Sequence, residues 1–433
     1  MRKFAFIVLF LMFSGVILAQ NNTSSPYSMY GIGDLAGDAF GRARAFGGAS
    51  IGVASNRYIN TKNPAAYAAY DSLSFLFEFG ARSITKDYET NSSSFSSTDP
   101  NIQYITMGFP ITSYLNATMG LLPYSDVGYN VNIETESDLL GDYTSKYYGL
   151  GGLNKAFLGL SFDYGRISAG VNASYLYGDL KQLNTLVTDS NYNYQKEINS
   201  VIGDFHFTYG LQYTQPVKDM KLTLGAVFEN RSAIRSKTSI ISGTTSRSPA
   251  GTNYTSILYS RIIDTVEYEV DDSKDVMLPM TYGFGVALEK ENSFLFAADY
   301  SMQDWKPGDG VYFSDSLGSS YTISGGMEFT PDYKAGRRNY LKKMRYRLGG
   351  YYNNSYIRIH GEQISDFGIS FGVGFPIRQF TSYNTINDKS SVNLSFTMGQ
   401  RGTVNSNLIK ENYYIFTLNL TLQDKWFVKS KFD

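Results

Sequence analysis

The chain has 433 residues, no cysteine and a formal net charge of −1, and it carries 36 tyrosines, 29 phenylalanines and 41 glycines. Its mean hydropathy is −0.23, and beyond the N-terminus no segment approaches 18 consecutive apolar residues, which excludes a helical membrane protein. The charge argues against nucleic acid as a partner, and the lack of cysteine excludes disulfides and a lipidated N-terminal cysteine. So much tyrosine, phenylalanine and glycine is unusual for a soluble enzyme but typical of membrane-spanning strands.

Residues 1–19 have the features of a secretory signal peptide. Arg2 and Lys3 precede an apolar stretch from Phe4 to Leu18, and the small residue Ala19 suits a cleavage site. A retained membrane helix needs roughly 20 apolar residues, and this stretch is shorter. We therefore expect an exported chain that is cut near Ala19.

Residues 20–71 show no alternation of apolar and polar residues, and they are rich in glycine and alanine. A disordered tail would carry more charge and fewer aromatic residues, whereas small residues allow close packing of the backbone in a confined space. We predict that this segment is a plug (hatch) inside the lumen of a barrel. Polar contacts are expected to hold it, between the basic residues Arg42, Arg44, Arg57 and Lys62 and the inward-facing Glu78, Glu229 and Glu289.

From residue 72 to residue 433, apolar residues recur at every second position in segments of about ten, which is the pattern of strands with one lipid-facing side. The clearest ladder runs from Phe367 to Phe375, interleaved with glycine and serine. A soluble β-sandwich would place charges on its outward face. We therefore predict an all-β fold, a 14-stranded antiparallel transmembrane β-barrel. Its strands are expected near 72–88, 101–109, 114–130, 155–163, 166–178, 203–214, 221–230, 279–289, 293–303, 320–330, 344–357, 364–376, 391–400 and 412–424.

The lengths of the connections orient the predicted barrel. Short joins follow every second strand, and short turns in such barrels face the periplasm. The intervening joins, at 131–154, 179–202 and 231–278, are polar and are predicted as outer loops. Residues 254–268 resemble a further strand, but an extra strand would break the even number, so they are assigned to the largest outer loop. Two predicted periplasmic joins, 331–343 and 377–390, are longer than usual.

No motif of the sequence predicts catalysis, a metal or a cofactor. Gly368 to Gly372 fits the pattern of a nucleophile elbow, but it lies inside an alternating strand with no helix after it. His206 lies between two phenylalanines and should point to the lumen as a hydrogen-bonding wall residue. An acidic run could hold Ca²⁺ but matches no EF-hand spacing, and a solvated loop is the better interpretation. This run is Glu267, Glu269, Asp271, Asp272 and Asp275.

Two motifs in the predicted plug resemble the hatch of the FadL family of outer-membrane transporters. One is the small-residue segment that contains Gly47 and Gly48, and the other is Asn63-Pro64-Ala65, just before the first strand. The resemblance implies passive diffusion of long-chain fatty acids or other hydrophobic molecules across the outer membrane of a Gram-negative bacterium. It also implies release sideways into the membrane lipid.

Two functions are compatible with these observations. The first, which the resemblance favours, is a channel for hydrophobic compounds such as long-chain fatty acids. It requires an apolar pocket near the plug. The second is a structural or assembly subunit of an outer-membrane protein complex, similar to PorV-type subunits, whose long outer loops bind partner proteins. The candidate pocket residues are Tyr27, Tyr30, Phe40, Phe46, Ile51, Tyr58 and Tyr67.

A sideways exit needs a break in the ladder of strands, and the third predicted strand contains a candidate. It includes Gly120, Leu121, Leu122 and Pro123. Proline has no N–H to donate, and glycine weakens a strand and tolerates a bulge. We expect the ladder to open there, unless Pro123 only ends the regular part of the strand.

Overall fold

The computed structural model describes residues 23–425, except residues 38, 92, 137–141, 189–191, 247–261, 312–315, 360, 378, 381–385 and 388. The predicted signal peptide, residues 1–19, lies outside the described residues. In the described part of the chain, no helix is both long and apolar enough to cross a membrane.

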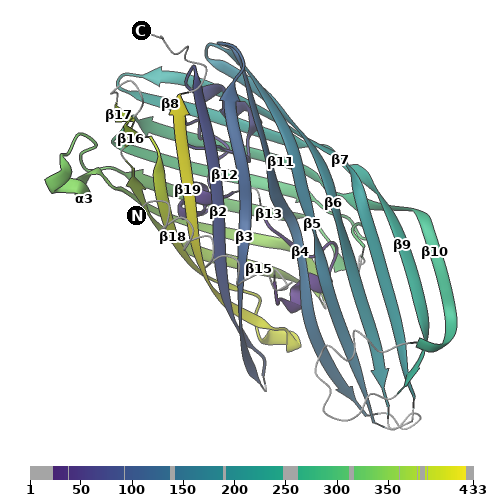
Figure 1. Ribbon diagram of the computed structural model, residues 1–433. Coiled ribbons are helices and arrows are strands. Elements are labelled where there is room, and N and C mark those ends of the chain that lie inside the picture. Colours follow the sequence, from purple (N-terminus) through teal and green to yellow (C-terminus); the bar gives the residue numbers. More distant parts are fainter. Residues whose placement is uncertain are drawn as a thin grey trace, which may run out of the picture.

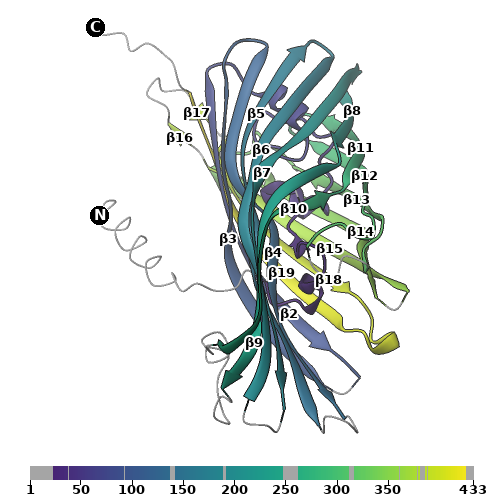
Figure 2. The same cartoon turned by 90° about the vertical axis from the view of Figure 1, so that its right-hand side faces the viewer.

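Fourteen strand positions form a closed antiparallel barrel, which confirms the predicted architecture (Figures 1 and 2). Each position pairs with the next along the chain, and the last strand pairs with the first. Closure gives every strand of the ring a neighbour on both sides, which a lipid environment demands. The positions are β2 (Ser74–Glu89), β3 (Ser94–Pro110), β4 (Leu115–Thr135), β5 (Tyr143–Tyr164), β6 (Ile167–Val187), β7 (Tyr192–Val217), β8 (Met220–Glu229), β11 (Met280–Lys290), β12 (Phe294–Asp304), β13 (Ser320–Phe329), β14 (Arg345–Ile359), β15 (Glu362–Pro376), β18 (Ser391–Arg401) and β19 (Lys410–Lys425).

The predicted outer loop 231–278 is wrong, because most of it is strand. β9 (Ser232–Ser246) continues the direction of β8, and both pair with β7. β10 (Ile262–Leu278) pairs with β9 and leads into β11, which pairs with β8. Pro279, which cannot donate a backbone hydrogen bond, separates β10 from β11. Since each pair occupies one position of the ring, the number of positions stays at fourteen.

The predicted outer loops 131–154 and 179–202 are wrong for the same reason, since β4, β5, β6 and β7 all extend through them. A tilted strand crosses a membrane in roughly 9 to 11 residues, and β7 has 26. The extra length forms a sheet that stands beyond the barrel, at the lower right of Figure 1. We call it the projecting sheet. It consists of residues 127–135 of β4, 143–152 of β5, 178–187 of β6, 192–202 of β7, and the whole of β9 and β10.

Around the ring, exposed apolar side chains alternate with inward-facing small and polar ones. Phe367, Ile369 and Phe371 are about half exposed, whereas Ser370 is buried. This confirms the predicted lipid-facing ladder. On the side of the short turns, η6 (Arg337–Asn339) and α3 (Tyr340–Lys343) occupy one of the longer joins, and β16 (Gln379–Phe380) with β17 (Ile386–Asn387) occupies the other. A further short helix, η7 (Asn405–Asn407), connects β18 to β19.

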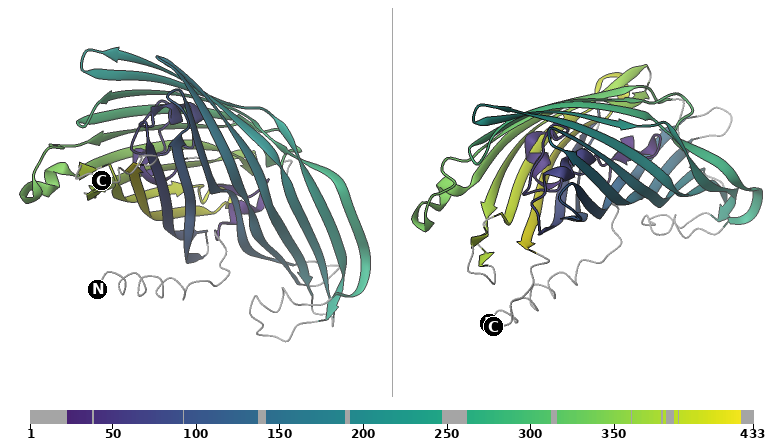
Figure 3. Two further views of the ribbon diagram at one scale, coloured as in Figure 1. Left: turned by 45° about the horizontal axis from the view of Figure 1, so that its top comes forward. Right: turned by 90° about the horizontal axis from the view of Figure 1, so that it is seen from above.

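The described residues 23–71, called the plug below, lie inside the barrel (Figure 3). They contain short elements only, and seven glycines interrupt the stretch from Gly31 to Gly52. These elements are η2 (Pro26–Met29), β1 (Asp34–Leu35), η3 (Gly41–Phe46) and η4 (Pro64–Ala69). The buried apolar residues form separate clusters where the plug meets the wall.

Candidate functional site

The first contact between plug and wall is the turn at Phe46 and Gly47. Gly47 has a left-handed φ of 67°, which ends η3 and turns the chain. The wall opposite carries Gly349, where an added Cβ would lie 2.1 Å from the carbonyl carbon of Phe46. The N–H of Gly47 donates to Ser370 Oγ at 3.0 Å. Ser370 is thus a buried strand residue that binds the plug backbone.

Two further parts of the plug contact glycines of the wall in the same way. A Cβ at Gly225 would lie 2.1 Å from the carbonyl oxygen of Ile51, and one at Gly210 would lie 2.1 Å from Oδ1 of Asn63. Asn63 also caps η4, since its side chain accepts the N–H of Ala65 at 3.0 Å. The Asn63-Pro64-Ala65 motif is therefore a helix start that is fitted against glycines of the barrel.

A cluster of buried charges fixes the plug on the side of the short turns. Arg42 of the plug pairs with Glu328 of β13 at 3.2 Å, and Arg347 of β14 pairs with the same carboxylate at 2.6 Å. Arg345 and Arg347 donate to the hydroxyl oxygen of Tyr58 at 2.6 and 3.0 Å. Burial alone would raise the pKa of Tyr58, but the two arginines lower it to about 8.

A second charged anchor lies at Asp299 of β12. Its carboxylate pairs with Lys62 at 3.0 Å and accepts the N–H groups of Ser50 and Ile51 at 2.7 and 2.9 Å. A carboxylate that is almost fully buried needs such partners, because an isolated buried charge is costly.

The glutamates that the sequence singled out contribute less to this contact. Glu78 accepts the backbone N–H of Ile59 at 3.3 Å. Glu229 lies 3.7 Å from His206 of the wall, and Glu289 lines a cavity. Sequence reasoning missed Asp299, Glu328, Arg345 and Arg347. The signal was available, because each of them alternates with lipid-facing residues and so points inward.

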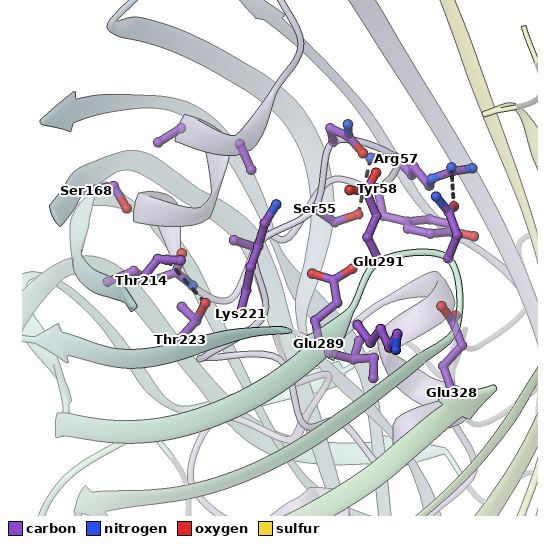
Figure 4. Close-up of a pocket in the computed structure, with 18 of the residues that line it drawn as sticks. Ser55, Arg57, Tyr58, Ser168, Thr214, Lys221, Thr223, Glu289, Glu291 and Glu328 are labelled. Atoms are coloured by element: carbon purple, nitrogen blue, oxygen red, sulfur yellow. Dashed lines mark hydrogen bonds between the residues drawn. The ribbon is translucent and has the colours of Figure 1, made fainter. Parts of the chain in front are cut away.

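A cavity of about 290 Å³ lies between the plug and the strands near the short turns (Figure 4). Charged and polar side chains surround it. The plug contributes Ser55, Arg57 and Tyr58, and the wall contributes Lys221, Glu289 and Glu328. A second cavity, of about 380 Å³, is lined by many ionisable side chains. These include Asp34, Arg44, Lys62, Arg82, Lys86, Asp126, Asp366 and Arg401. Such surroundings suit water and ions better than a hydrocarbon.

Three of the predicted pocket residues, Phe40, Phe46 and Tyr58, line a small cavity of about 30 Å³ in the described structure, and the other four do not line it. Tyr27 belongs to one buried cluster, Phe40 and Tyr67 to a second, and Phe46 to a third. Tyr30 packs against the first cluster, Ile51 contacts wall glycines, and Tyr58 contacts arginines. Six of the seven are buried, and Tyr30 is half-buried. Their packing stabilises the plug inside the wall.

The wall has a gap between β3 and β4, beside the predicted lateral opening. The two strands pair only from Pro110 with Asn116 to Ile105 with Leu121. Beyond Leu121 they separate, although β4 continues for another fourteen residues, to Thr135. Pro123 follows two residues after the last pair, and β4 has an irregularity against β5 there.

The first part of the plug fills this gap. Ser24 donates to Asp99 of β3 at 3.0 Å. On the other side, β1 pairs with β4, Leu35 opposite Ser125. Ser28 exchanges hydrogen bonds with the backbone of Gly128 at 3.0 and 3.2 Å. The plug thus takes the place of the missing ladder between β3 and β4.

The remaining residues that the sequence singled out lie apart from these contacts. His206 is buried in the wall, with its Nδ1 3.2 Å from Ser232 Oγ. The acidic run lies on β10 instead of in a loop, which corrects its predicted placement. Within the residues that the structure describes, no three His, Asp or Glu side chains are positioned to hold a metal ion.

A family model described as BamG matches residues 1–433, the whole chain. The chain belongs to the BamG family. No curated protein sequence matches it.

Solved structures with the fold of this BamG-family chain include three proteins of low sequence identity. The toluene transporter TbuX of Ralstonia pickettii aligns with a TM-score of 0.56 and 12% identity, over 90% of this chain and 99% of its own. The toluene transporter TodX of Pseudomonas putida aligns with a TM-score of 0.55 and 14% identity, over 91% of this chain and 100% of its own. A FadL homologue of Pseudomonas aeruginosa aligns with a TM-score of 0.53 and 10% identity, over 92% of this chain and 99% of its own. The predicted FadL-like fold is confirmed.

The glycine contacts of the BamG-family barrel predict a selective effect of one methyl group. Gly349→Ala should push the plug turn off the wall and cost about 1 to 3 kcal/mol, as overpacking does. The melting temperature of the detergent-purified barrel should fall by several degrees, and protease should cut the plug faster. Gly325→Ala is the matched control, because its Cβ would meet nothing closer than 3.6 Å. Equal melting of both variants and the parent would rule out the close contact at Gly349.

The arginines around Tyr58 predict a tyrosinate at unusually low pH. Ultraviolet titration of the parent against Tyr58→Phe should show one tyrosine with a pKa of about 8, whereas unfolded tyrosines titrate near ~10. Between these values the unfolded state binds more protons, so the stability that Tyr58 contributes should rise with pH and be lost below about pH 8. A difference spectrum that appears only near pH ~10 contradicts this arrangement.

Proposed function

We propose that this chain works as a subunit that binds a partner protein at the outer membrane. The projecting sheet carries this proposal. Ile133, Tyr192 and Tyr268 are each about half exposed or more, and they lie in the projecting sheet, beyond the lipid-facing part of the barrel. Apolar side chains that face neither lipid nor core mark surfaces for protein association.

The interior of the barrel supports the same proposal. A hydrophobic cargo needs an apolar route, whereas many charged side chains line the two cavities of about 290 and 380 Å³. The plug that separates them is held by buried ion pairs, and breaking one such pair typically costs 3 to 5 kcal/mol, on the order of a large core mutation. A fixed plug suits a scaffold.

Gentle purification followed by native mass spectrometry tests this function. We expect a protein partner in a fixed ratio to the barrel. Replacing Ile133 and Tyr192 with serine should lower the bound fraction without changing the amount of folded barrel. Replacing the exposed Leu341, on the opposite side of the membrane, with serine is the control. A parent barrel that carries only lipid, with no protein in a fixed ratio, would contradict the proposal.

A second candidate function is passive uptake of hydrophobic compounds such as long-chain fatty acids, with gating by the plug and lateral release. The gap between β3 and β4 favours it, because displacement of β1 would leave this break beside Gly120 to Pro123 without the plug that fills it. Two of the solved structures with this fold are toluene transporters by their titles. On this hypothesis β1 is the gate.

A disulfide would lock that gate in a chain that has no cysteine of its own. Leu35→Cys with Ser125→Cys joins two residues that are directly opposite each other in the β1–β4 pair. Oxidation should slow uptake of a labelled fatty acid in cells, and reduction should restore it. The control pair, Thr144→Cys with Val187→Cys, crosslinks β5 to β6 away from the plug. Uptake that is indifferent to the Leu35–Ser125 crosslink would remove β1 as the gate.

A further inference from the structure

We infer that β10 is an open sheet edge that binds a partner by strand addition, and that the partner strand alternates apolar and basic residues. The inference rests on the proposed partner-binding function and specifies the chemistry of the partner. It starts from the pairing of β10.

Only one side of β10 has a strand beside it in the described structure. β9 pairs with it along its whole length, from Ile262 to Leu278. On the other side, β12 pairs with β11 and ends at Asp304, opposite Met280. Past this point one backbone bond reaches β10, from the N–H of Gly310 to the carbonyl of Met277 at 3.3 Å. Figures 1 and 3 show β10 as the last strand of the projecting sheet.

The open edge has two regular stretches, residues 267–271 and 274–278, between and beside the register shifts of its pairing with β9. The second is already contacted, since the carbonyl of Met277 accepts the N–H of Gly310, which leaves residues 267–271. Bulges usually protect edges from pairing, which makes this run the part of β10 that can accept another strand. Five residues are close to the length of an average strand.

The two faces of this run differ in chemistry. Tyr268 is 69% exposed and Val270 is 42% exposed, and both lie on the outward face. Glu267 lies on the inward face, where it contacts Lys196 of β7 at 3.3 Å and Ser242 of β9 at 3.2 Å. Glu269 shares that face, because strand residues alternate. An added strand would therefore meet apolar side chains on one face and carboxylates on the other.

The charge of β10 selects the partner. Residues 262–278 contain six acidic residues and one lysine. Opposite charges across neighbouring strands stabilise a sheet, and like charges destabilise it. A second copy of this chain, paired through the same edge, would bring acidic rows together. The edge therefore fits a different protein, with lysine or arginine at every second position of an extended segment.

The test uses the full barrel in detergent and synthetic peptides as probes. A fluorescent peptide of alternating lysine and valine should bind the parent, and the matching peptide of alternating glutamate and valine should not. The double substitution Asp264→Lys, Glu269→Lys should lower the affinity of the barrel for the lysine peptide about tenfold and raise its affinity for the glutamate peptide. Both positions are exposed, so the barrel should still fold.

Two controls separate strand addition from simple charge attraction. Glu362→Lys changes an exposed acid at the β14–β15 turn and should leave binding unchanged. The lysine peptide with methylated backbone nitrogens at alternate positions keeps its charge but cannot donate hydrogen bonds, and it should not bind. Equal binding of the methylated peptide, equal binding by the charge-reversed barrel, or binding of neither peptide to the parent would overturn the inference. The inference would also be overturned if the parent barrel forms a dimer and the Asp264→Lys, Glu269→Lys barrel forms a tighter one.

Different results would contradict the proposed partner-binding function and the inference that β10 accepts a strand. A protein that stays bound to the Asp264→Lys, Glu269→Lys barrel supports partner binding and places it elsewhere, which overturns the edge. If no protein accompanies the parent barrel, the proposed function falls, and the peptides alone then decide whether the edge accepts a strand.

Discussion

The need to pair every backbone N–H and C=O group inside the membrane governs this structure. Where the chain crosses the lipid, fourteen strand positions close into a ring, and the plug fills the gap between β3 and β4. Beyond the lipid, water satisfies unpaired groups, and the ring opens into the projecting sheet. That sheet ends at β4 on one side and at β10 on the other. The plug covers the base of β4 through Ser28 and β1, whereas most of β10 has a strand on one side only in the described structure.

The lumen follows a second rule, which is that the plug and the wall share one set of small residues and buried charges. Wall glycines such as Gly349 and Gly225 leave room for the plug backbone, and Asp299 and Glu328 neutralise its cations. The same segment closes the gap between β3 and β4. One stretch of fewer than fifty residues therefore fills the lumen, completes the wall and sets the charge of the cavities. These combined roles explain why its sequence mixes glycine, arginine and tyrosine.

The sequence was sufficient for the ring because lipid imposes an alternation that local residues reveal, as from Phe367 to Phe375. It was insufficient for β9 and β10, because a further strand at residues 254–268 was rejected to keep the strand number even, whereas β9 and β10 extend the positions of β8 and β11 and add none. The glycines of the plug predicted its location in the sequence, but they did not predict which residues of the wall it contacts. Lys62 and Asp299 lie 237 positions apart, and their contact depends on the curvature of the whole barrel. The candidate pocket residues were predicted from their aromatic content, which alone cannot distinguish a packed core from a ligand cavity.

The seam of the ring lies beside the base of the plug. The side chain of Gln423 in β19 donates to the carbonyl of Asn56 at 3.2 Å and to Asp71 at 3.3 Å, and Lys389 also pairs with Asp71. The Gln423 contacts exist only when the last strand lies against β2, so they form when the barrel closes. Ring closure and attachment of this end of the plug are thus coupled through β19. A chain interrupted before β19 would lack the closed ring and the Gln423 contacts but would keep the wall partners of Arg42 and Lys62.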